Sequence, residues 1–152
     1  MLNSGTDHHD AVIKNRADGY AVEKGVVVNA RYIDMSIPTG GGSLYSTVED
    51  IALRDQALYT ERLLSKKSID AIFTPYINTP FGDSAGYGWF ISKDEANRRV
   101  IGHTRRINGF SNEATHFPDQ HVFIAVFCNK SGVETEKIVP RLAAILFGGN
   151  NN

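Results

Sequence analysis

Residues 102–112 read Gly-His-Thr-Arg-Arg-Ile-Asn-Gly-Phe-Ser-Asn, and they connect two of the four predicted strands that decide the fold. From Tyr87 onward the apolar residues change from helical to strand-like spacing. The predicted strands cover residues 88–92, 99–104, 111–117 and 121–129, and short polar turns separate them. Strands joined by such short turns pair antiparallel. Residues 81–131 are therefore predicted to form an antiparallel β-meander.

Residues 1–80 are predicted to contain mainly loops and helices. The first 45 residues show few long apolar periods, which indicates loops with short strands such as residues 25–28. Ser46 and Glu49 have the spacing of a capping box, and Val48, Ile51, Ala52 and Leu58 follow at helical spacing. A second helix is predicted to begin after Ser65 and to end before Pro75, burying Ile69, Ile72 and Phe73.

The last predicted element is a helix within residues 132–147. Its predicted apolar face consists of Val133, Ile138, Leu142, Ile145 and Leu146. Pro140 is expected to mark a kink or a late helix start. Gly148 and Gly149 are expected to end the helix, and the Asn residues 150–152 to fray. The chain is thus predicted to have an α+β fold, an antiparallel meander with flanking helices in one domain of residues 1–152.

Composition limits the classes of partner. The 152 residues include 16 basic and 17 acidic side chains, and this balance disfavours nucleic acids and anionic membranes as partners. No signal peptide or membrane-spanning segment is predicted, because the longest apolar run is far too short to cross a bilayer. The single cysteine, Cys128, is predicted to be a buried strand residue. The sequence does not assign a cellular compartment.

Several motifs carry a family resemblance. His103, Thr104, Asn108, Gly109 and Phe110 match a His-Thr-Gly-x-x-Asn-Gly-Phe pattern in register, with Arg105 in place of the first Gly. Residues 40–50 are similar to a Gly-rich turn before a helix, residues 86–90 to a strand entering the sheet, and residues 1–6 to an internal segment. Together they resemble the C-terminal half of the β-lactamase/transpeptidase-like fold of the serine β-lactamase and penicillin-binding-protein superfamily. The resemblance is strongest to its class C β-lactamase, D-aminopeptidase and esterase branch.

The resemblance implies roles for five residues. His103 would take part in a proton-transfer network, and the Thr104 hydroxyl would hold a substrate carboxylate or carbonyl. The backbone N–H of Arg106 would be one oxyanion-hole donor, a role that does not depend on its side chain. Arg105 and Asn108 would contact substrate. Arg105 or Arg106 binding a carboxylate is one interpretation, and two solvated arginines on an edge strand is the other.

Two other motifs of the family decide what the chain is expected to do. No serine is followed three residues later by lysine, so the Ser-x-x-Lys nucleophile is missing. We also expect the chain to lack the Tyr-x-Asn loop. The first hypothesis is therefore a portion of a serine hydrolase that is inactive alone. The alternatives are a non-catalytic remnant of the fold, or a hydrolase that uses Ser43 or Ser111 beside His103.

Partners and ligands follow from the same reasoning. A complementary N-terminal half, or a second copy in a homo-oligomer, is expected to pair with residues 122–128, because an unpaired edge strand normally finds a partner. No cofactor or metal ion is expected, since His8, His9 and Asp10 are adjacent residues that rarely converge on one ion. Gly40–Gly42 is interpreted as a tight turn. The aromatic residues Tyr87, Trp89 and Phe90 either stack a ligand or form core.

Overall fold

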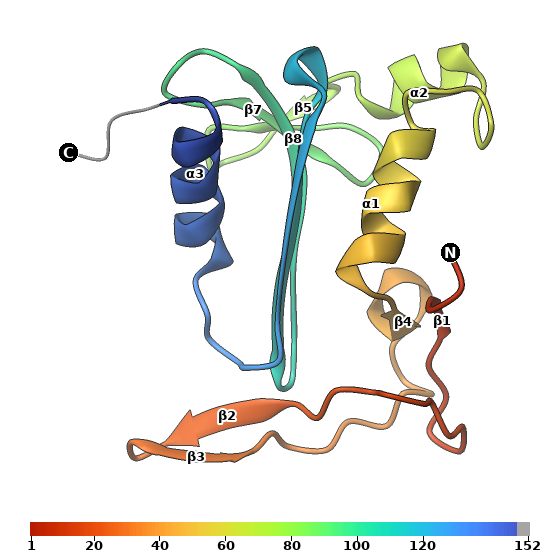
Figure 1. The fold of residues 1–152 in the computed structure, drawn as a ribbon, viewed down its shortest axis with the longest axis vertical. Helices are drawn as coiled ribbons and strands as arrows, with labels where there is room; N and C mark the ends of the chain where they lie inside the picture. The colour runs from red at the N-terminus through yellow and green to blue at the C-terminus, as the bar shows by residue number, and fades with distance from the viewer. Residues whose placement is uncertain (149–152) are drawn as a thin grey trace.

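The computed structural model describes residues 1–148, and its centre is a six-stranded antiparallel sheet (Figure 1). The strands lie in the order β10-β9-β8-β7-β6-β5. They are β5 (Ile77–Asn78), β6 (Ser84–Ala85), β7 (Phe90–Lys93), β8 (Arg99–Ile107), β9 (Phe110–Phe117) and β10 (Val122–Cys128). Each strand pairs with the next along the chain, which confirms the predicted meander and the α+β fold.

Short turns set the register of the three long strands. Ile107 pairs with Phe110, so only Asn108 and Gly109 connect β8 to β9, and Gly109 has a φ of +82°. The 3₁₀ turn η2 (Pro118–Gln120) and His121 connect β9 to β10. β10 lies at an edge of the sheet, as the sequence predicted for residues 122–128.

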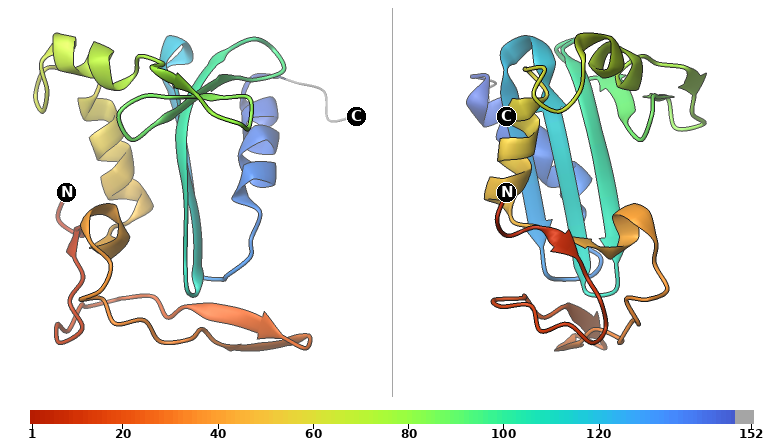
Figure 2. Two further views of the ribbon diagram at one scale, coloured as in Figure 1. Left: turned by 180° about the vertical axis from the view of Figure 1, so that it is seen from behind. Right: turned by 90° about the vertical axis from the view of Figure 1, so that its right-hand side faces the viewer.

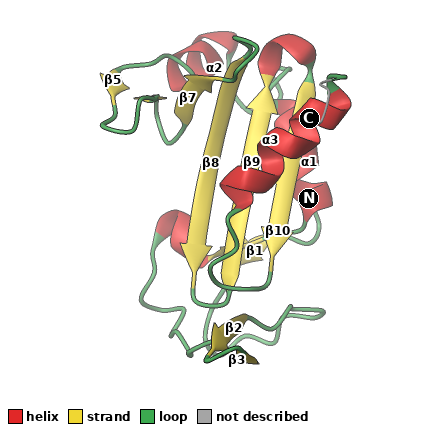
Figure 3. Ribbon diagram, turned by 90° about the vertical axis from the view of Figure 1, so that its left-hand side faces the viewer, coloured by secondary structure: helices red, strands yellow, loops and turns green. Residues whose placement is uncertain are grey.

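Two helices cover opposite faces of these long strands. Helix α1 (Val48–Ala57) lies on one side of the sheet and α3 (Thr135–Leu146) on the other, with α2 (Lys66–Ile72) beyond the end of α1 (Figures 1 and 2). In Figure 3, α3 crosses in front of β9 and β10 while α1 lies behind them. The sheet therefore separates two apolar clusters.

The two clusters hold the domain together. The cluster on the α1 side contains Leu58, Phe73, Trp89, Ile91 and Ile101. The cluster on the α3 side contains Phe117, Ile124, Val139 and Ala143. Burial of each large side chain contributes about 1.5–3 kcal/mol. Together they fix α1 and α3 relative to β8, the strand that carries residues 99–107.

The N-terminal part of the chain forms small two-stranded sheets. β1 (Gly5–Thr6) pairs with β4 (Leu44–Tyr45), which follows the 3₁₀ turn η1 (Gly40–Ser43). β2 (Tyr20–Glu23) and β3 (Val26–Asn29) form a hairpin beside the β8–β9 turn (Figure 1). Only glycines allow that contact, because a Cβ on Gly109 would lie 2.5 Å from Cα of Gly19.

Helix α1 begins one residue later than the capping box predicted. The cap is Thr47, whose hydroxyl accepts a hydrogen bond from Asp50 N at 3.2 Å. Ser46 was the wrong residue, because its hydroxyl lies 2.7 Å from that of Ser4 instead. Helix α2 begins after Ser65 and ends before Pro75, as predicted.

Helix α3 lies within the predicted residues 132–147, starts before Pro140 rather than late, and differs from its prediction in the face that it buries. It begins at Thr135 and contains Pro140, and its buried residues are Thr135, Val139 and Ala143. Three residues of the predicted apolar face are partly or largely exposed, namely Leu142 (37%), Ile145 (62%) and Leu146 (61%).

Three further predictions concern the end of the last helix, the burial of Cys128 and membrane-spanning segments. Gly148 follows the helix with a φ of +73°, whereas Gly149 and residues 150–152 lie outside the described residues. Cys128 is half-buried, so the prediction of a buried residue was wrong. Among residues 1–148 no helix has the length and hydrophobicity that a membrane crossing requires.

Candidate functional site

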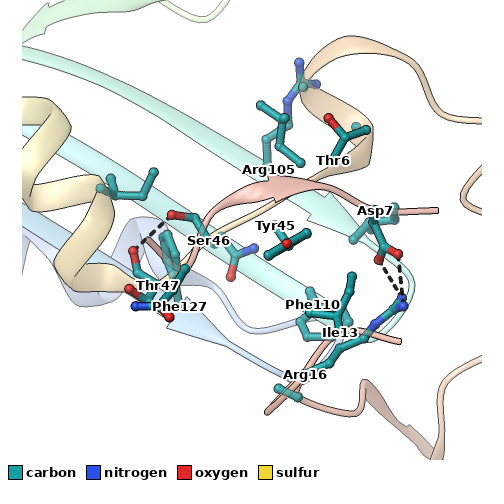
Figure 4. A pocket seen from close by; sticks show the side chains of 18 of the residues that line it. Thr6, Asp7, Ile13, Arg16, Tyr45, Ser46, Thr47, Arg105, Phe110 and Phe127 are labelled. Carbon is teal, nitrogen blue, oxygen red and sulfur yellow. Dashed lines mark hydrogen bonds and ion pairs between the residues drawn. The ribbon is translucent and has the colours of Figure 1, made fainter. Parts of the chain in front are cut away.

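A groove with a volume of about 1370 Å³ opens between α1, the N-terminal segment and the sheet. Side chains of β8 and β9, among them His103, Arg105 and Asn112, line its floor. Thr47, the cap of α1, and Arg54 on α1 line one wall. The other wall consists of Thr6, Asp7, Ile13 and Arg16 of the N-terminal segment (Figure 4). The groove therefore joins segments that are far apart in the sequence.

The alternation of side chains along β8 divides the predicted site residues between two faces. His103 and Arg105 line the groove. Successive side chains of a strand point to opposite faces, so Thr104 and Arg106 lie on the α3 side. The Arg106 guanidinium confirms this placement, because it contacts the Glu136 carboxylate on α3 at 2.5 Å.

One edge of β8 is open along its second half. β7 pairs with residues 99–102, whereas residues 103–107 have only β9 beside them among the described strands. The two-residue turn makes Ile107 and Phe110 a hydrogen-bonded pair, and such pairs alternate with non-hydrogen-bonded ones. The N–H groups of Thr104 and Arg106 therefore point toward the open edge. The His103 ring lies at this edge too, with Nδ1 2.7 Å from Thr104 O.

Basic side chains outnumber acidic ones around the groove. The basic residues that line it are Lys14, Arg16, Arg54 and Arg105. The acidic residues are Asp7 and Glu113, and Glu113 turns its carboxylate to the opposite face of β9. Arg16 is neutralised by Asp7, with N–O distances of 3.0 and 2.7 Å, and Arg54 lies over the Trp89 ring at 5.1 Å. Arg105 makes no ion pair within residues 1–148. The groove floor thus offers a free guanidinium to an anionic ligand.

Two buried carboxylates hold the N-terminal wall in place. Asp7 is buried, and both oxygens of its carboxylate contact the Arg16 guanidinium. Its backbone N–H donates to Ser43 O at 2.7 Å. Asp50 on α1 accepts hydrogen bonds from the Ser4 hydroxyl (2.7 Å) and from Asn3 N (2.8 Å). The hydrogen bond from Ser4 is the main reason why the pKa of Asp50 lies below its usual value.

A buried contact between a carboxylate and an imidazole fixes the other end of α1. Asp55 Oδ1 lies 2.7 Å from His116 Nδ1 on β9, with side-chain exposures of 5% and 3%. The Tyr59 hydroxyl lies 3.3 Å from the same nitrogen. Burial raises the pKa of Tyr59 to about 12, with Asp55 and Asp119 adding to the effect. Contacts of Asp50 and Asp55 therefore fix α1 at both ends, and the groove-lining residues of the helix lie between these contacts.

Glu113 lies on the face of β9 opposite the groove floor. It pairs across the strands with Thr104, and its carboxylate accepts a hydrogen bond from the Thr115 hydroxyl at 3.1 Å. Burial raises the pKa of Glu113 above its usual value. This carboxyl group belongs to the interface between the sheet and α3.

The structure does not bring the two candidate serines to His103. Ser111 is fully buried on the α3 side of β9, where its hydroxyl accepts from Val133 N at 3.3 Å. The buried Ser43 hydroxyl donates to Gly40 O at 3.2 Å. His103 has no hydrogen bond to a hydroxyl within residues 1–148. These contacts argue against a nucleophile of the chain's own at His103.

Two predictions about motifs have simple outcomes. The Tyr-x-Asn spacing occurs once, at Tyr76-Ile77-Asn78, so its expected absence from the sequence was wrong. This segment includes β5, at the edge of the sheet three strands from β8, and does not line the groove. In residues 1–148 no group of three His, Cys, Asp or Glu side chains is arranged to hold a metal ion.

The residues of the groove wall were not predicted from the sequence. Asn108 was predicted to contact substrate, and in the structure its amide holds a turn. The Asn108 side-chain amide donates to Arg31 O at 3.2 Å, which ties the β8–β9 turn to the segment after β3. Asp7 and Arg16 lie in a polar stretch whose spacing carries no regular pattern. No signal in the sequence pairs them, because the loop between them is irregular.

Relatives of the chain are found among both sequences and solved structures. The family model described as Beta-lactamase matches residues 1–147. Penicillin-binding protein 4* of Bacillus subtilis (strain 168) is 29% identical over 112 residues, which cover 72% of the chain and 25% of that protein. The chain thus spans about a quarter of the length of this relative.

Two solved structures show the same arrangement of elements. The octameric penicillin-binding protein homologue from Pyrococcus abyssi superposes with a TM-score of 0.88 and 27% identity, covering 99% of the chain and 35% of that protein. A D-stereospecific amidohydrolase from a Streptomyces species superposes with a TM-score of 0.76. At 20% identity, covering 91% of the chain and 42% of that protein, it supports the fold alone.

Proposed function

The chain belongs to the beta-lactamase family, and from this premise we propose that it is the C-terminal portion of a serine hydrolase. The reaction would be acyl transfer, in which a serine outside residues 1–152 attacks an amide, lactam or ester carbonyl. The chain would supply the substrate-binding strand and part of the oxyanion hole. Because no Ser-x-x-Lys occurs in it, we expect the chain to be inactive alone.

The open edge of β8 carries this proposal. The N–H of Arg106 points to that edge and is not used by β9, so it is free to donate to an oxyanion. The Thr104 N–H points the same way, which would let an extended substrate backbone lie along residues 103–107. An edge strand open at a groove is the arrangement that such binding needs.

His103 and Thr104 would assist at the same edge. The His103 ring lies beside the edge, in position to join a proton-transfer network that the rest of the domain would complete. The Thr104 hydroxyl is exposed on the α3 side, from which it would reach a substrate group that extends past the strand. Both roles are proposals from the family pattern at residues 103–110.

Arg105 and Asn108 would contribute to substrate binding in different ways. Arg105 projects into the groove near Thr6 and would bind a carboxylate with its unpaired guanidinium (Figure 4). Asn108 would act by holding the turn after β8, since its amide is already bonded to Arg31 O. A guanidinium in place of glycine narrows the groove, so we expect small anionic substrates rather than bulky ones.

The rest of the domain, or a second copy, would attach at β10. Its outer edge has no strand partner among residues 1–148, and α1 and α3 flank it on both faces. Apolar surface is also exposed on α3, the helix that packs on β9 and β10, at Leu142, Ile145 and Leu146. We propose that a complementary N-terminal half pairs with β10, and that a homo-oligomer through the same strand is the alternative.

The proposal is tested with a chimera in which residues 1–147 replace the matching part of the Bacillus subtilis relative. The intact mass is measured after incubation with benzylpenicillin or a fluorophosphonate. We expect an adduct on the relative's serine and none on the isolated chain. In the chimera, Arg106→Pro removes the donor without breaking the pairing with β9, and should slow acylation roughly 10²–10³-fold.

Arg106→Ala is the matched control, because it keeps the backbone N–H and loses only the side chain. Equal rates for the Pro and Ala variants would contradict the oxyanion role. An adduct on the isolated chain that disappears on replacing Ser43 or Ser111 would show an internal nucleophile. A folded chimera that reacts with neither probe would favour the non-catalytic remnant.

A further inference from the structure

The turn between β8 and β9 consists of Asn108 and Gly109, and no other asparagine of the sequence is followed by glycine. Asparagine is one of the thermolabile residues of proteins, because the backbone nitrogen of the next residue can attack the carbonyl carbon of its side chain. Glycine in the next position favours this attack, since it has no Cβ to obstruct the approach. By its sequence, Asn108 is therefore the asparagine of this chain that is most prone to react.

The reaction is an intramolecular deamidation with water as its only co-reactant. The Gly109 nitrogen loses its proton and forms a bond to Cγ of Asn108, while the Cγ–Nδ2 bond breaks and ammonia leaves with that proton. Water then opens the cyclic imide at either of its carbonyl groups. Opening at one carbonyl gives aspartate, and opening at the other gives isoaspartate, whose backbone is longer by one carbon. Nothing is oxidised or reduced.

The side chain of Asn108 is accessible to this water. It is exposed, and it lines a small surface cavity of about 260 Å³ together with Ser131 and Gly132. Gly109, in contrast, is buried at a φ of +82°. The two reacting groups of the turn therefore differ in their surroundings, with the amide in solvent and the attacking nitrogen inside the fold.

Two hydrogen bonds oppose the attack in the folded chain. Gly109 N donates to Ser131 Oγ at 2.7 Å, and this bond favours the protonated form of the nitrogen. Asn108 Nδ2 donates to Arg31 O at 3.2 Å, which holds the leaving amide against the segment after β3. Formation of the imide requires that both hydrogen bonds break.

Both acceptors come from segments that are distant in sequence from the turn. Ser131 follows β10, and Arg31 follows the hairpin of β2 and β3, which lies beside the turn (Figure 1). The hairpin approaches so closely that a Cβ on Gly109 would lie 2.5 Å from Cα of Gly19. The restraint on Asn108 therefore lasts only while these two segments are docked on the turn.

We propose that Asn108 is a deamidation site whose reaction is restrained by Ser131 and by the docked hairpin of β2 and β3. A chain whose N-terminal segment leaves the turn is then marked by a new carboxylate at this position. Aspartate lacks the Nδ2 donor and sets a negative charge against Arg31 O, which opposes redocking. Isoaspartate lengthens a turn of two residues and so disturbs the pairing of Ile107 with Phe110.

Peptide mapping of the full chain tests the proposal. The folded chain and the same chain in guanidinium chloride are incubated at one mildly alkaline pH, and tandem mass spectrometry follows the tryptic peptide that begins at Ile107. We expect Asn108 to react more slowly in the folded chain than in the unfolded one. Ser131→Ala should speed the reaction of the folded chain about 2–12-fold, the factor that one hydrogen bond contributes. Ser131→Thr keeps the acceptor and should react at the wild-type rate.

Ser84→Ala is the matched control, because it removes a half-buried serine hydroxyl on β6, away from the turn, and it should leave the rate unchanged. Asn108→Gln should remove the signal, since glutamine would have to close a larger ring. Equal rates for folded and unfolded wild-type chains would overturn the restraint, and this comparison stands even if Ser131→Ala fails to fold. A folded Ser131→Ala variant that reacts at the wild-type rate would overturn the role of Ser131. Reaction at Asn112 or Asn129 in place of Asn108 would overturn the site.

Discussion

Replacing His116 with phenylalanine should strongly destabilise the fold, because it removes the imidazole that contacts the buried Asp55 carboxylate. The two side chains are 3% and 5% exposed, and His116 Nδ1 lies 2.7 Å from Asp55 Oδ1. Breaking a buried pair in this way costs about 3–5 kcal/mol. For a domain of this size each kcal/mol corresponds to about 2–4 °C, so the melting temperature should fall by about 6–20 °C.

The double variant His116→Phe with Asp55→Leu distinguishes the interaction between the two side chains from the cost of burying two polar groups. It removes both polar groups together, so it should recover much of the loss of the single variant. Urea unfolding followed by circular dichroism and by Trp89 fluorescence gives the free energies for a double-mutant cycle. We expect a coupling of at least about 2 kcal/mol, within the range for residues in contact.

An exposed pair provides the control for this cycle. Lys66 and Asp70 on α2 lie 3.5 Å apart with side chains 79% and 64% exposed. Lys66→Ala should therefore change stability by less than about 0.5 kcal/mol. A His116→Phe cost below about 1 kcal/mol, or a double variant as unstable as the sum of the singles, would refute the reasoning.

Three further outcomes follow from contacts around the groove. Asp50→Ala removes the acceptor of Ser4 and Asn3, so it should lower the melting temperature and speed hydrogen exchange in residues 2–6. Because the pKa of Asp50 is lowered, its contribution is present above the unfolded pKa and should fade as the pH falls below it. Gly109→Ala, at a φ of +82° and against Gly19, should cost at least about 2 kcal/mol, whereas Gly25→Ala at +80° in open space should cost less. Absorbance titration should show one tyrosine with a pKa of about 12, and this titration should be absent in Tyr59→Phe. Stability should decline between about pH 10 and 12, because the folded state favours the neutral phenol while the unfolded chain loses the proton.

The predictable part of the fold is the part with local patterns. Strand alternation and short turns predicted the meander around β8 and β9, since neighbouring strands joined by a two-residue turn have almost no other way to pair. The cap of α1 was misplaced by one residue because Ser46 and Thr47 each have an acidic residue three positions on. Only the contact of Ser46 with Ser4, more than 40 residues away, decides between them.

The face of α3 shows where a helical pattern is not enough. The largest apolar residues of the helix suggested the buried face, yet the sheet receives Val139 and Ala143 and leaves Leu142, Ile145 and Leu146 outside. The smaller side chains let the helix pack closely on β9 and β10. The hydrophobic pattern of a helix predicts which of its faces can be buried. In this chain, packing against the sheet determines which of those faces is buried.

The candidate site was predictable only along β8. The family pattern located His103 and Arg105, which line the groove, but it did not show that Thr104 and Arg106 face away from it. The ion pair between Asp7 and Arg16 depends on the path of an irregular loop. Such a path cannot be predicted from the spacing of apolar residues. The sequence thus predicts which residues lie along this strand, whereas the walls of the groove are not predictable from it.

Two long-range hydrogen bonds, one at the β8–β9 turn and one after β10, bear on the order of folding. Asn108 bonds to Arg31 and Asn129 bonds to Asp18 across sequence separations of 77 and 111 residues. The meander itself closes through turns of a few residues, so it meets a much smaller entropic barrier. During synthesis the N-terminal segment emerges first but has no surface to dock on until the last strands arrive. We therefore expect the groove to form after the meander.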